Sequence, residues 1–499
     1  MTPVQNPQSG PRDFPSRFED LKHVHIVGVC GTLMGAFAAF LRRRGLEVTG
    51  SDQNVYPPMS DVLAQAGVKL LSGYQASHLS AFGKKPDLVV IGNVIRADNP
   101  EAVEAMTKGY AYTSLPEAME KLLLQRTRNI VVAGTHGKTT TSSMMAFVLQ
   151  AFQKKPSYFI GGVLHDLPHS FHVESLEGGA PFVLEGDEYD TAFWDKVPKF
   201  NHYLPDDVIF TSMEYDHADI YPDFAAVKRA FEGLLARIRP GGSLVLCQDY
   251  ESMIGMEKQV SVPVITYSSG RTAAGKNADY RIGEVQTTQD GKSRFSIFKK
   301  QSDQSIETLE LQVPGTHNAL NALAVWILAT RMGMASSEVK AALLNFRGVK
   351  RRQEERGERR GVLVIDDFAH HPTAVRETLQ ALKKKYAHRR LVAVFEPRSA
   401  TSRRKVFQKE YAQAFKEAAA TFIAQPYDPS RIVPADQFSS DQLVRDLTEQ
   451  GGRAWVMPSV EEGVAQVAGF TEKGDLVAVL SNGGFGGFIQ KLLDRLAVP

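Results

Sequence analysis

The segment from Gly134 to Thr140, GTHGKTT, combines the residue types that hold a nucleotide phosphate. It follows an apolar run typical of a strand and precedes a run typical of a helix, which is the context of a phosphate-binding loop. Glycines let backbone N–H groups point at phosphate oxygens, and the helix N-terminus adds positive potential. A plain glycine turn is the alternative, because the glycines lie closer together than in the general motif. We expect nucleotide contacts from Gly134, Thr135, Gly137, Lys138, Thr139 and Thr140, with Lys138 reaching the outer phosphates.

Acidic side chains at the end of the apolar run PFVLEGD indicate a metal site. Hard cations take oxygen ligands and bridge to phosphates, so Glu185 and the Thr139 hydroxyl suit Mg²⁺ beside a phosphate loop. Taken alone, an acidic strand end is more often a solvated turn. The next apolar run leads into Asp216 and His217. A lone histidine is usually structural, but beside an acidic site His217 becomes a plausible ligand of a second metal.

The starts of two further expected helices are weaker indications of binding sites. His317 and Asn318 begin a long apolar run, where Asn318 either caps the helix or hydrogen-bonds an adenine edge. Near the N-terminus, a GxxGxxxG turn precedes a helix, and Asp52 ends the second strand. This arrangement puts a helix N-terminus where a diphosphate can sit. The glycines of this turn are Gly28, Gly31 and Gly35.

The composition of the 499 residues indicates a globular protein of two to four domains. A net charge of +2 argues against a general nucleic-acid surface, and basic runs such as Lys383 to Lys385 are read as a solvated helix face. With only Cys30 and Cys247, no disulfide scaffold is expected. No stretch resembles a signal peptide or a membrane span, so we expect a cytoplasmic protein with no membrane partner.

Alternating strand and helix patterns predict three α/β units built on doubly wound sheets. We expect a polar leader over residues 1–20, a first domain over 21–127, a central domain over 128–347 and a third over 348–499. The expected buried strands contain HVHIVG, DLVVIGN, NIVVAG, PFVLEGD, DVIFTSM, GVLVIDDF, LVAVFEP and DLVAVLSNGG.

Five motifs make the chain resemble the Mur ligases, which are ATP-dependent amide-bond-forming enzymes of peptidoglycan synthesis. GTHGKTT, EGDEYD, DHAD, PGTHNALNA and DDFAHHPT occur in the family's order and approximate spacing, and the resemblance runs from Gly28 to Gly487. It implies a Rossmann-like N-terminal domain that binds the UDP sugar, a central P-loop ATPase-type domain and a Rossmann-like C-terminal domain. The cofactors it implies are ATP and Mg²⁺.

The resemblance is strongest to the branch whose acceptor of the amine is UDP-N-acetylmuramate. GVCGTLMG, VVIGNVIRADNP, FEPRSATSRRK and LSNGGFGGF resemble the members that attach a whole murein tripeptide. We therefore expect UDP-N-acetylmuramate and that tripeptide as substrates. The alternatives are a ligase that adds L-alanine and, from another class, a nucleotide-switched binding protein that makes no bond. A monomer or a weak homodimer is expected.

The resemblance also implies a role for each matching residue. Lys138 steadies the β- and γ-phosphates, Thr139 and Glu185 hold the first Mg²⁺, and His217 binds the second metal. The expected catalytic residues are Lys138, His217 and Arg352. Arg352 reaches the γ-phosphate, Asp367 meets the ATP ribose, and His317 and Asn318 address adenine. His370 and Arg398 contact the peptide. The UDP-sugar residues are Gly28, Gly31, Gly35, Asp52 and Asn93.

One position departs from several sister ligases, which carry a carbamoylated lysine after the Asp-His strand. Alignment places Phe231 there, and Lys228 is out of register. We therefore expect no carbamate, a feature shared with the L-alanine-adding members.

Overall fold

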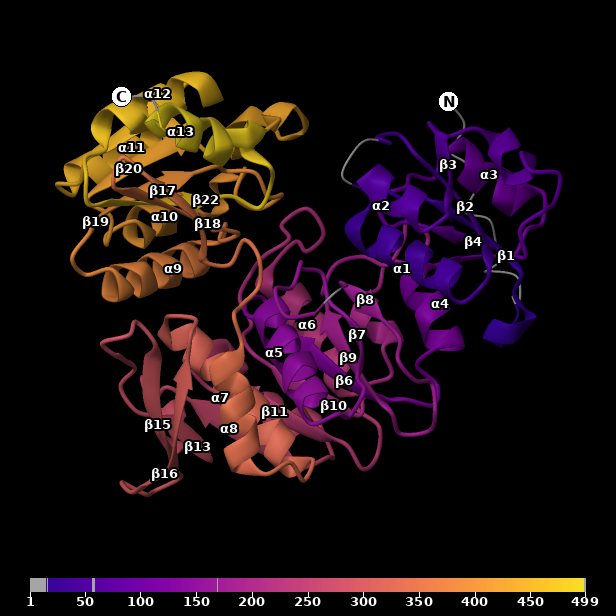
Figure 1. Ribbon diagram of the computed structural model, residues 1–499, viewed down its shortest axis with the longest axis horizontal. Helices are drawn as coiled ribbons and strands as arrows, with labels where there is room; N and C mark the ends of the chain where they lie inside the picture. The colour runs from indigo at the N-terminus through magenta and orange to yellow at the C-terminus, as the bar shows by residue number, and fades with distance from the viewer. Residues whose placement is uncertain (1–14, 16, 56–58, 168, 498–499) are drawn as a thin grey trace.

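The computed structural model describes residue 15 and residues 17–55, 59–167 and 169–497. They form three α/β domains, each built on its own sheet, which confirms the predicted fold class (Figure 1). Most of the predicted polar leader, residues 1–14 and 16, lies outside the described residues, and Phe18–Asp20 form a short 3-10 helix. In the described part of the chain, no helix is both long and apolar enough to cross a membrane.

The first domain is a five-stranded parallel sheet in the order β3-β2-β1-β4-β5. All five residues of β1 are buried, as expected for a central strand of a parallel sheet covered on both faces. Asn99 and Ser114 cap the helices that follow them by accepting backbone N–H groups. The strands are β1 (His23–Val27), β2 (Glu47–Asp52), β3 (Lys69–Ser72), β4 (Leu88–Ile91) and β5 (Tyr112–Ser114), and the helices are α1 (Thr32–Arg43), α2 (Met59–Gln65), α3 (Pro100–Thr107) and α4 (Leu115–Leu122).

The central domain has an eleven-stranded sheet in which β6 lies between β10 and β9, all three parallel. The carboxyl ends of these strands therefore meet at one edge, where ligands bind in open α/β sheets. An antiparallel extension made by β13 to β16 continues the sheet. The strands are β6 (Arg128–Ala133), β7 (Ser157–Phe159), β8 (Phe171–His172), β9 (Pro181–Gly186), β10 (Asp207–Phe210), β11 (Ser243–Cys247), β12 (Val264–Ser268), β13 (Tyr280–Ile282), β14 (Gln286–Thr287), β15 (Ser293–Lys299) and β16 (Ser305–Leu311), and the helices are α5 (Lys138–Ala151), α6 (Phe224–Leu235), α7 (Thr316–Arg331) and α8 (Ser336–Asn345).

The third domain is a six-stranded sheet in the order β17-β18-β22-β19-β20-β21, with only β17 antiparallel to its neighbour. Side chains alternate along β18, so Leu363 and Ile365 join one apolar cluster while Val362 and Val364 join the other. Helices α9 to α11 contribute to the first cluster, and α12 and α13 to the second. The strands are β17 (Glu354–Arg359), β18 (Val362–Asp367), β19 (Arg390–Phe395), β20 (Ala420–Ala424), β21 (Ala454–Met457) and β22 (Asp475–Leu480), and the helices are α9 (Pro372–Lys385), α10 (Gln408–Ala414), α11 (Ser440–Glu449), α12 (Val460–Phe470) and α13 (Phe488–Ala497).

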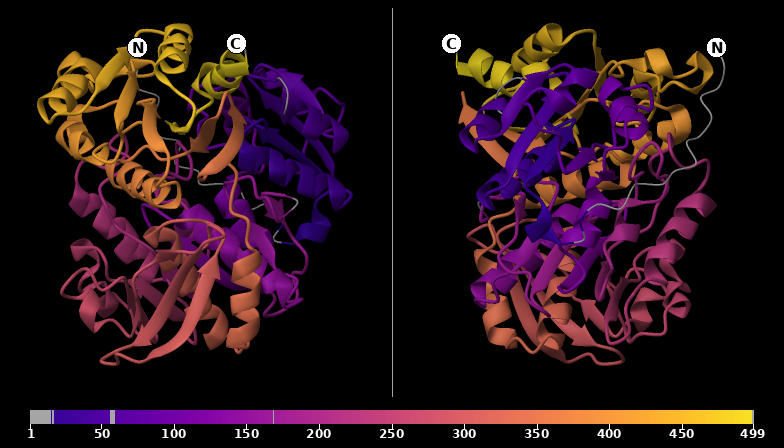
Figure 2. Two further views of the ribbon diagram at one scale, coloured as in Figure 1. Left: turned by 60° about the vertical axis from the view of Figure 1, so that its left-hand side comes forward. Right: turned by 90° about the vertical axis from the view of Figure 1, so that its right-hand side faces the viewer.

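The first and third domains both sit on one side of the central domain, as the views in Figures 1 and 2 agree. The contact between the first and central domains has an aromatic core, where the rings of Phe37 and Phe40 lie 5.7 and 5.1 Å from that of Phe171. Polar contacts join the third domain to the central one and are described below. All the quoted strand runs are strands in the structure, whereas the domain boundaries at residues 127 and 347 stay predictions.

Candidate active site

The phosphate loop lies between β6 and α5, and its backbone requires glycine at two positions. Gly134 has φ +138° and Gly137 has φ +83°, and Gly137 is the N-cap of α5. A Cβ on Gly134 would lie 2.3 Å from the Thr211 hydroxyl, and one on Gly137 would lie 2.8 Å from the side-chain oxygen of Asn321. The helix begins at Lys138, so free N–H groups of its first turn face the site. This geometry suits a bound phosphate.

The Lys138 side chain is largely covered, and its ammonium contacts oxygen atoms of the phosphate loop and of Glu188. Its Nζ donates to the Gly134 carbonyl at 2.7 Å and lies 2.9 Å from Glu188 Oε2. Burial alone would lower the pKa of Lys138, but Glu188 and Asp187 outweigh it and raise the pKa above its usual value. The ammonium is therefore a fixed positive charge at the mouth of the phosphate loop.

Glu188 is shared between Lys138 and the predicted metal ligand His217. His217 Nε2 lies 3.2 Å from Glu188 Oε1. Burial opposes ionisation, yet Lys138 and His217 lower the pKa of Glu188 to about 2. Against the same burial, the contact with Glu188 raises the pKa of His217 to about 9. His217 is thus an imidazolium at neutral pH here, and it must lose a proton before it can bind a metal.

Thr139 and Glu185 form the part of the site that fits Mg²⁺. The Thr139 hydroxyl donates to Glu185 Oε1 at 2.5 Å, and Glu185 Oε2 accepts the Gly161 N–H at 2.6 Å. Burial, together with the nearby Asp187 carboxylate, raises the pKa of Glu185. A divalent cation would remove this penalty, and a hydroxyl with a carboxylate is the oxygen ligand set that Mg²⁺ prefers. The donor chemistry therefore fits the predicted ion.

Asp216 links the central domain to the third domain. Its Oδ1 accepts the Thr401 hydroxyl at 2.5 Å, and its Oδ2 lies 4.0 Å from His370 Nε2. Thr401 also accepts the Ala218 N–H at 3.3 Å. Burial opposes ionisation of Asp216, but His217 and His370 hold its pKa well below the usual range. An ionised Asp216 therefore organises both sides of the domain interface.

Arg352 enters the site from the start of the third domain. Its guanidinium lies 3.5 Å from the Thr139 hydroxyl and 4.9 Å from the centre of the Phe368 ring. Its neighbour Arg351 instead donates to the carbonyls of Ser481 and Gly483 at 2.7 and 2.6 Å. Of two adjacent arginines, Arg352 thus faces the phosphate loop while Arg351 supports the fold.

Asp367 ends β18 and is buried. Its two carboxylate oxygens accept the N–H groups of Gln353 and Ala369 at 2.8 and 2.7 Å. Burial raises the pKa of Asp367 despite the neighbouring Arg352. These bonds orient the carboxylate and fix the turn that carries Arg352.

His317 and Asn318 begin α7 beside the phosphate loop. The capping alternative for Asn318 is wrong, because Gly315 is the N-cap and Asn318 Nδ2 donates to the Pro314 carbonyl at 2.7 Å. Burial and the nearby Arg352 lower the pKa of His317 to about 4, so its ring is neutral and can accept a hydrogen bond. These residues remain the predicted adenine contacts.

A cavity of about 1120 Å³ joins these groups between the central and third domains. Thr32, at the start of α1, also reaches its wall, so the first domain opens toward the same space. The predicted residues that line it are Thr135, Gly137, Lys138, Thr139, Thr140, Glu185, His217, His317, Asn318, Arg352, Asp367 and His370.

Several predicted residues lie outside the lining of this cavity. Gly134 packs beneath the loop against Thr211 and Ser212. Arg398 stacks on Tyr427 at 3.7 Å from the ring centre, while the residues that follow it, Ser399 to Thr401, line the cavity. Arg398 is still placed at one end of that segment, and its contact with the peptide stays a prediction.

The predicted UDP-sugar residues lie at the carboxyl ends of β1, β2 and β4 and at the start of α1, outside the cavity lining. Asp52 accepts the Cys30 N–H at 2.9 Å and so holds the glycine turn in place. Gly28 has φ +83°, and a Cβ on Gly35 would lie 2.8 Å from Met59 Sδ. Asn93 is exposed after β4, and Gly31 is the N-cap of α1. Diphosphate binding at this turn stays a prediction.

The structure brings in residues that sequence reasoning missed. His136, Glu214, His371, Thr401 and Asn482 all line the cavity. His136 and His371 stand inside motifs already singled out, and Glu214 precedes Asp216 by two residues. Thr401 and Asn482 also lie inside quoted motifs, FEPRSATSRRK and LSNGGFGGF, so motif membership was a usable signal for every one of these residues except Glu214.

Phe231 belongs to the core of the central domain. Its ring lies 4.7 Å from that of Phe210 and 5.5 Å from that of Phe200. Neither Phe231 nor Lys228 lines the cavity. The expected absence of a carbamoylated lysine stays a prediction.

Three profiles of one family match the chain. The Mur ligase family catalytic domain matches residues 23–127, the Mur ligase middle domain matches 132–329, and the Mur ligase glutamate ligase domain matches 351–483.

Curated relatives match along almost the whole chain. The UDP-N-acetylmuramate–L-alanyl-gamma-D-glutamyl-meso-2,6-diaminoheptandioate ligase of Escherichia coli (strain K12) is 36% identical over 477 residues, covering 95% of this chain and 98% of the relative. The UDP-N-acetylmuramate–L-alanine ligase of Streptomyces coelicolor is 34% identical over 474 residues, covering 95% and 97%.

Solved structures agree with this relationship. A murein peptide ligase from Psychrobacter arcticus is 34% identical with a TM-score of 0.69, covering 96% of this chain and 99% of that one. The UDP-N-acetylmuramate-alanine ligase of Thermotoga maritima has a TM-score of 0.74 over 95% of this chain and 99% of that one, and its 24% identity supports a shared fold alone.

Proposed function

Because this chain belongs to the Mur ligase family, we propose that it joins L-alanyl-γ-D-glutamyl-meso-diaminopimelate to UDP-N-acetylmuramate with the hydrolysis of ATP to ADP and phosphate. The observation that carries the proposal is the interdomain cavity, where a phosphate loop, acidic strand ends and an arginine of the third domain meet. We propose that the reaction, which reuses a whole tripeptide, belongs to peptidoglycan recycling in the cytoplasm. The protein would act as a monomer or a weak homodimer.

ATP is needed because a carboxylate is a poor acylating agent. In the proposed reaction, a carboxylate oxygen of UDP-N-acetylmuramate attacks the γ-phosphorus, the bond to the β–γ bridging oxygen breaks, and ADP leaves. The product is an acyl phosphate. The amine of the peptide then attacks the acyl carbon, phosphate departs with the former carboxylate oxygen, and the amine loses a proton as the amide forms.

Two anions must approach each other in the first step, so fixed positive charge is the main requirement. Lys138 is held at the phosphate loop by Glu188, and Arg352 faces the same loop from the third domain. Thr139 and Glu185 would hold Mg²⁺, which supplies charge neutralisation at the phosphates when bound. His217 would join the metal site after losing its proton to solvent or substrate.

The third domain completes the site. Thr401 and His370 approach Asp216, and Arg352 approaches Thr139, all across the domain interface. Opening that interface would withdraw Arg352 from the phosphate loop. Substrate binding can thus be coupled to assembly of the catalytic groups.

A second candidate differs only in the amine. The Streptomyces relative that adds L-alanine is nearly as similar to this chain as the relative that adds the peptide. The segment EPRSATSRR, which starts at Glu396, follows β19 and lines the cavity with Ser399 to Thr401. We expect it to serve a peptide larger than L-alanine.

The reaction is tested with UDP-N-acetylmuramate labelled with ¹⁸O in its carboxylate. Incubation with ATP, Mg²⁺ and an equimolar mixture of tripeptide and L-alanine should yield the tripeptide product and one ¹⁸O atom per phosphate released. Unlabelled phosphate would refute the acyl phosphate, and a product containing only L-alanine would select the second candidate. ATP turnover unchanged without UDP-N-acetylmuramate would indicate a nucleotide-switched binding protein.

A further inference from the structure

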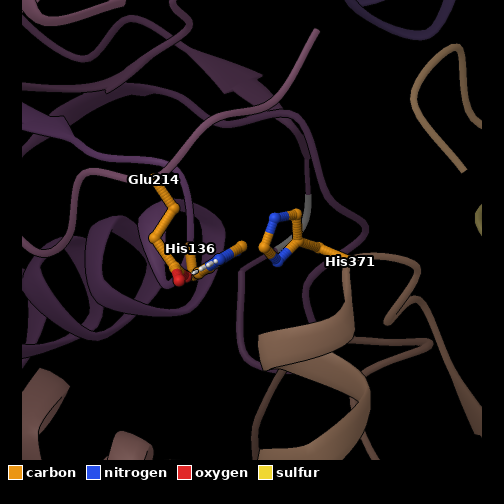
Figure 3. A group of neighbouring side chains, drawn as sticks. All are labelled: His136, Glu214 and His371. Atoms are coloured by element: carbon orange, nitrogen blue, oxygen red, sulfur yellow. Dashed lines mark hydrogen bonds and ion pairs between the residues drawn. The ribbon is translucent and has the colours of Figure 1, made fainter. Parts of the chain in front are cut away.

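Three side chains without an assigned role gather where the phosphate loop meets the third domain (Figure 3). His136 comes from the phosphate loop, Glu214 follows β10, and His371 caps α9. One nitrogen or oxygen atom from each lies within 4.8 Å of the others. Among the described residues, no other group of three histidine, cysteine or acidic side chains is drawn together this closely.

The contacts within the cluster already orient its members. His136 Nε2 lies 2.7 Å from Glu214 Oε2, and the rings of His136 and His371 are 4.6 Å apart. The Thr373 hydroxyl donates to the other oxygen of Glu214 at 3.0 Å. The Tyr215 carbonyl lies 3.2 Å from His371 Nε2. Hydrogen bonds to outer carbonyls and hydroxyls are the usual support of metal ligands.

The protonation of the cluster decides which electron pairs a metal could use. In the neutral ring of His371, Nε2 faces the Tyr215 carbonyl and carries the proton, and Nδ1 accepts the Thr373 N–H at 3.3 Å. A metal bound to Nδ1 would replace this long capping bond. Burial and the neighbouring His136 lower the pKa of His371 to about 4, so its imidazole is neutral at pH 7. Against the effect of burial, His136 lowers the pKa of Glu214 to about 2, so that carboxylate is ionised. A cation placed between His136 and Glu214 would take the position of the proton that they now share.

We propose that His136, Glu214 and His371 bind one divalent transition-metal ion of the Zn²⁺ class, at a site separate from that of Mg²⁺. Two imidazoles and one carboxylate are a ligand set of zinc, whereas Mg²⁺ takes oxygen ligands. Tetrahedral ligands at about 2.0–2.1 Å from zinc lie roughly 3.3 Å apart. The widest separation of up to 4.8 Å therefore shortens by about 1.5 Å on binding, which side-chain rotation can supply.

The position of the site gives the ion a structural consequence. His136 and Glu214 belong to the central domain and His371 to the third, so one ion would hold the two domains together. Glu214 and His371 also line a second, more open cavity of about 410 Å³, which offers a path from solvent. The fourth ligand position can be filled from either cavity by water.

Co²⁺ is the probe that tests the site, because its visible absorption reports imidazole ligands and low coordination number. The full-length protein, stripped with a chelator and free of nucleotide, is titrated with Co²⁺ and then with Zn²⁺. We expect one intense Co²⁺ site per chain that Zn²⁺ empties. Glu214→Gln and His371→Gln should each weaken the affinity at least about tenfold.

Two variants serve as matched controls. His388→Gln removes an exposed histidine of the same domain, and His217→Ala removes the predicted ligand of the second metal. Both should bind Co²⁺ as the wild type does. The proposal is overturned if the wild type shows no intense Co²⁺ band, if Glu214→Gln binds as tightly as wild type, or if His217→Ala alone abolishes the band. Circular dichroism checks the fold of each variant, and Glu214→Gln decides the matter if His371→Gln unfolds.

Discussion

The ammonium of Lys138 both forms an ion pair with Glu188 and supplies the proposed catalytic charge at the phosphates. Replacing Lys138 by methionine should therefore lower both the stability of the protein and its kcat. The ammonium lies 2.9 Å from Glu188 and donates to the Gly134 carbonyl at 2.7 Å, with its side chain only 12% exposed. Loss of one partner of a buried pair usually destabilises a protein by about 3–5 kcal/mol. Because His217 remains 3.2 Å from the same carboxylate, we expect the lower end, about 3 kcal/mol. A fixed donor at a developing charge is worth about 10²–10³ in kcat.

Lys199 provides a control from the same acidic pocket. Its ammonium lies 3.4 Å from Asp187 and 4.1 Å from the ring centre of Tyr189, yet it does not line the cavity. Lys199→Met also breaks a buried ion pair, so it should destabilise the protein by a similar amount, about 3 kcal/mol. We expect its kcat to stay within about threefold of wild type, which is about 0.6 kcal/mol in the barrier.

The assay is ADP release with saturating ATP, UDP-N-acetylmuramate and tripeptide, run beside thermal unfolding of each variant. Lys138→Met should lose kcat by about 10²–10³ while it remains folded at the assay temperature. The reasoning fails if Lys138→Met keeps more than about a tenth of the wild-type kcat, or if Lys199→Met loses as much.

Three other perturbations follow from the geometry. Gly137→Ala should abolish ATP binding measured by calorimetry, because φ of Gly137 is +83° and the added Cβ would lie 2.8 Å from a side-chain oxygen. Gly270 also has a positive φ but has no atom within 4 Å of an added Cβ, so Gly270→Ala should bind ATP normally. Equal ATP binding by the two variants would contradict the loop geometry. His217→Ala should raise the Mg²⁺ concentration needed for half-maximal turnover, and an unchanged Mg²⁺ titration would exclude His217 from the metal site. His202 has two carboxylate partners that, against burial, raise its pKa to about 9. The stabilisation that protonated His202 provides should be complete below pH 6.5 and lost as the pH rises through about 9. The urea midpoint of His202→Gln should therefore be lower than that of the wild type at pH 6 and approach it at pH 9.5. An equal difference at both pH values would refute the ion pair.

Local patterns were enough to predict the strands and the helix starts that carry the motifs. The run before Gly134 is a buried strand, and a helix begins at Lys138, as predicted. Both could be predicted because an apolar run, a glycine turn and a run of helix-forming residues are visible within a short stretch of sequence. The choice of Asn318 as a possible cap was wrong because Gly315, three residues earlier, adopts a positive φ and starts the helix instead. Capping depends on backbone geometry that side-chain type alone does not specify.

Contacts between domains could not be predicted in the same way. Thr401 meets Asp216 across 185 residues of sequence, and the motif that contains this threonine does not specify its partner. Arg398, the conspicuous charge of its segment, instead stacks on Tyr427. Which loops meet across the interface depends on how the separate sheets of the two domains pack together, and no short stretch of sequence specifies that packing.

The sequence by itself determined the chemistry available to this protein: a phosphate loop, oxygen ligands for a cation and the motifs of one ligase family. Each of these features consists of residues close together in the sequence, and the backbone of a few residues is enough to fix their relative positions. The family resemblance already pointed to Arg352, and the structure shows how it differs from its neighbour: Arg351 donates to the Ser481 carbonyl, while Arg352 approaches Thr139. Only the tertiary structure decided that His136, Glu214 and His371 meet. Those outcomes depend on how three separately folded sheets pack, because side chains far apart in the chain approach each other only where the domains touch.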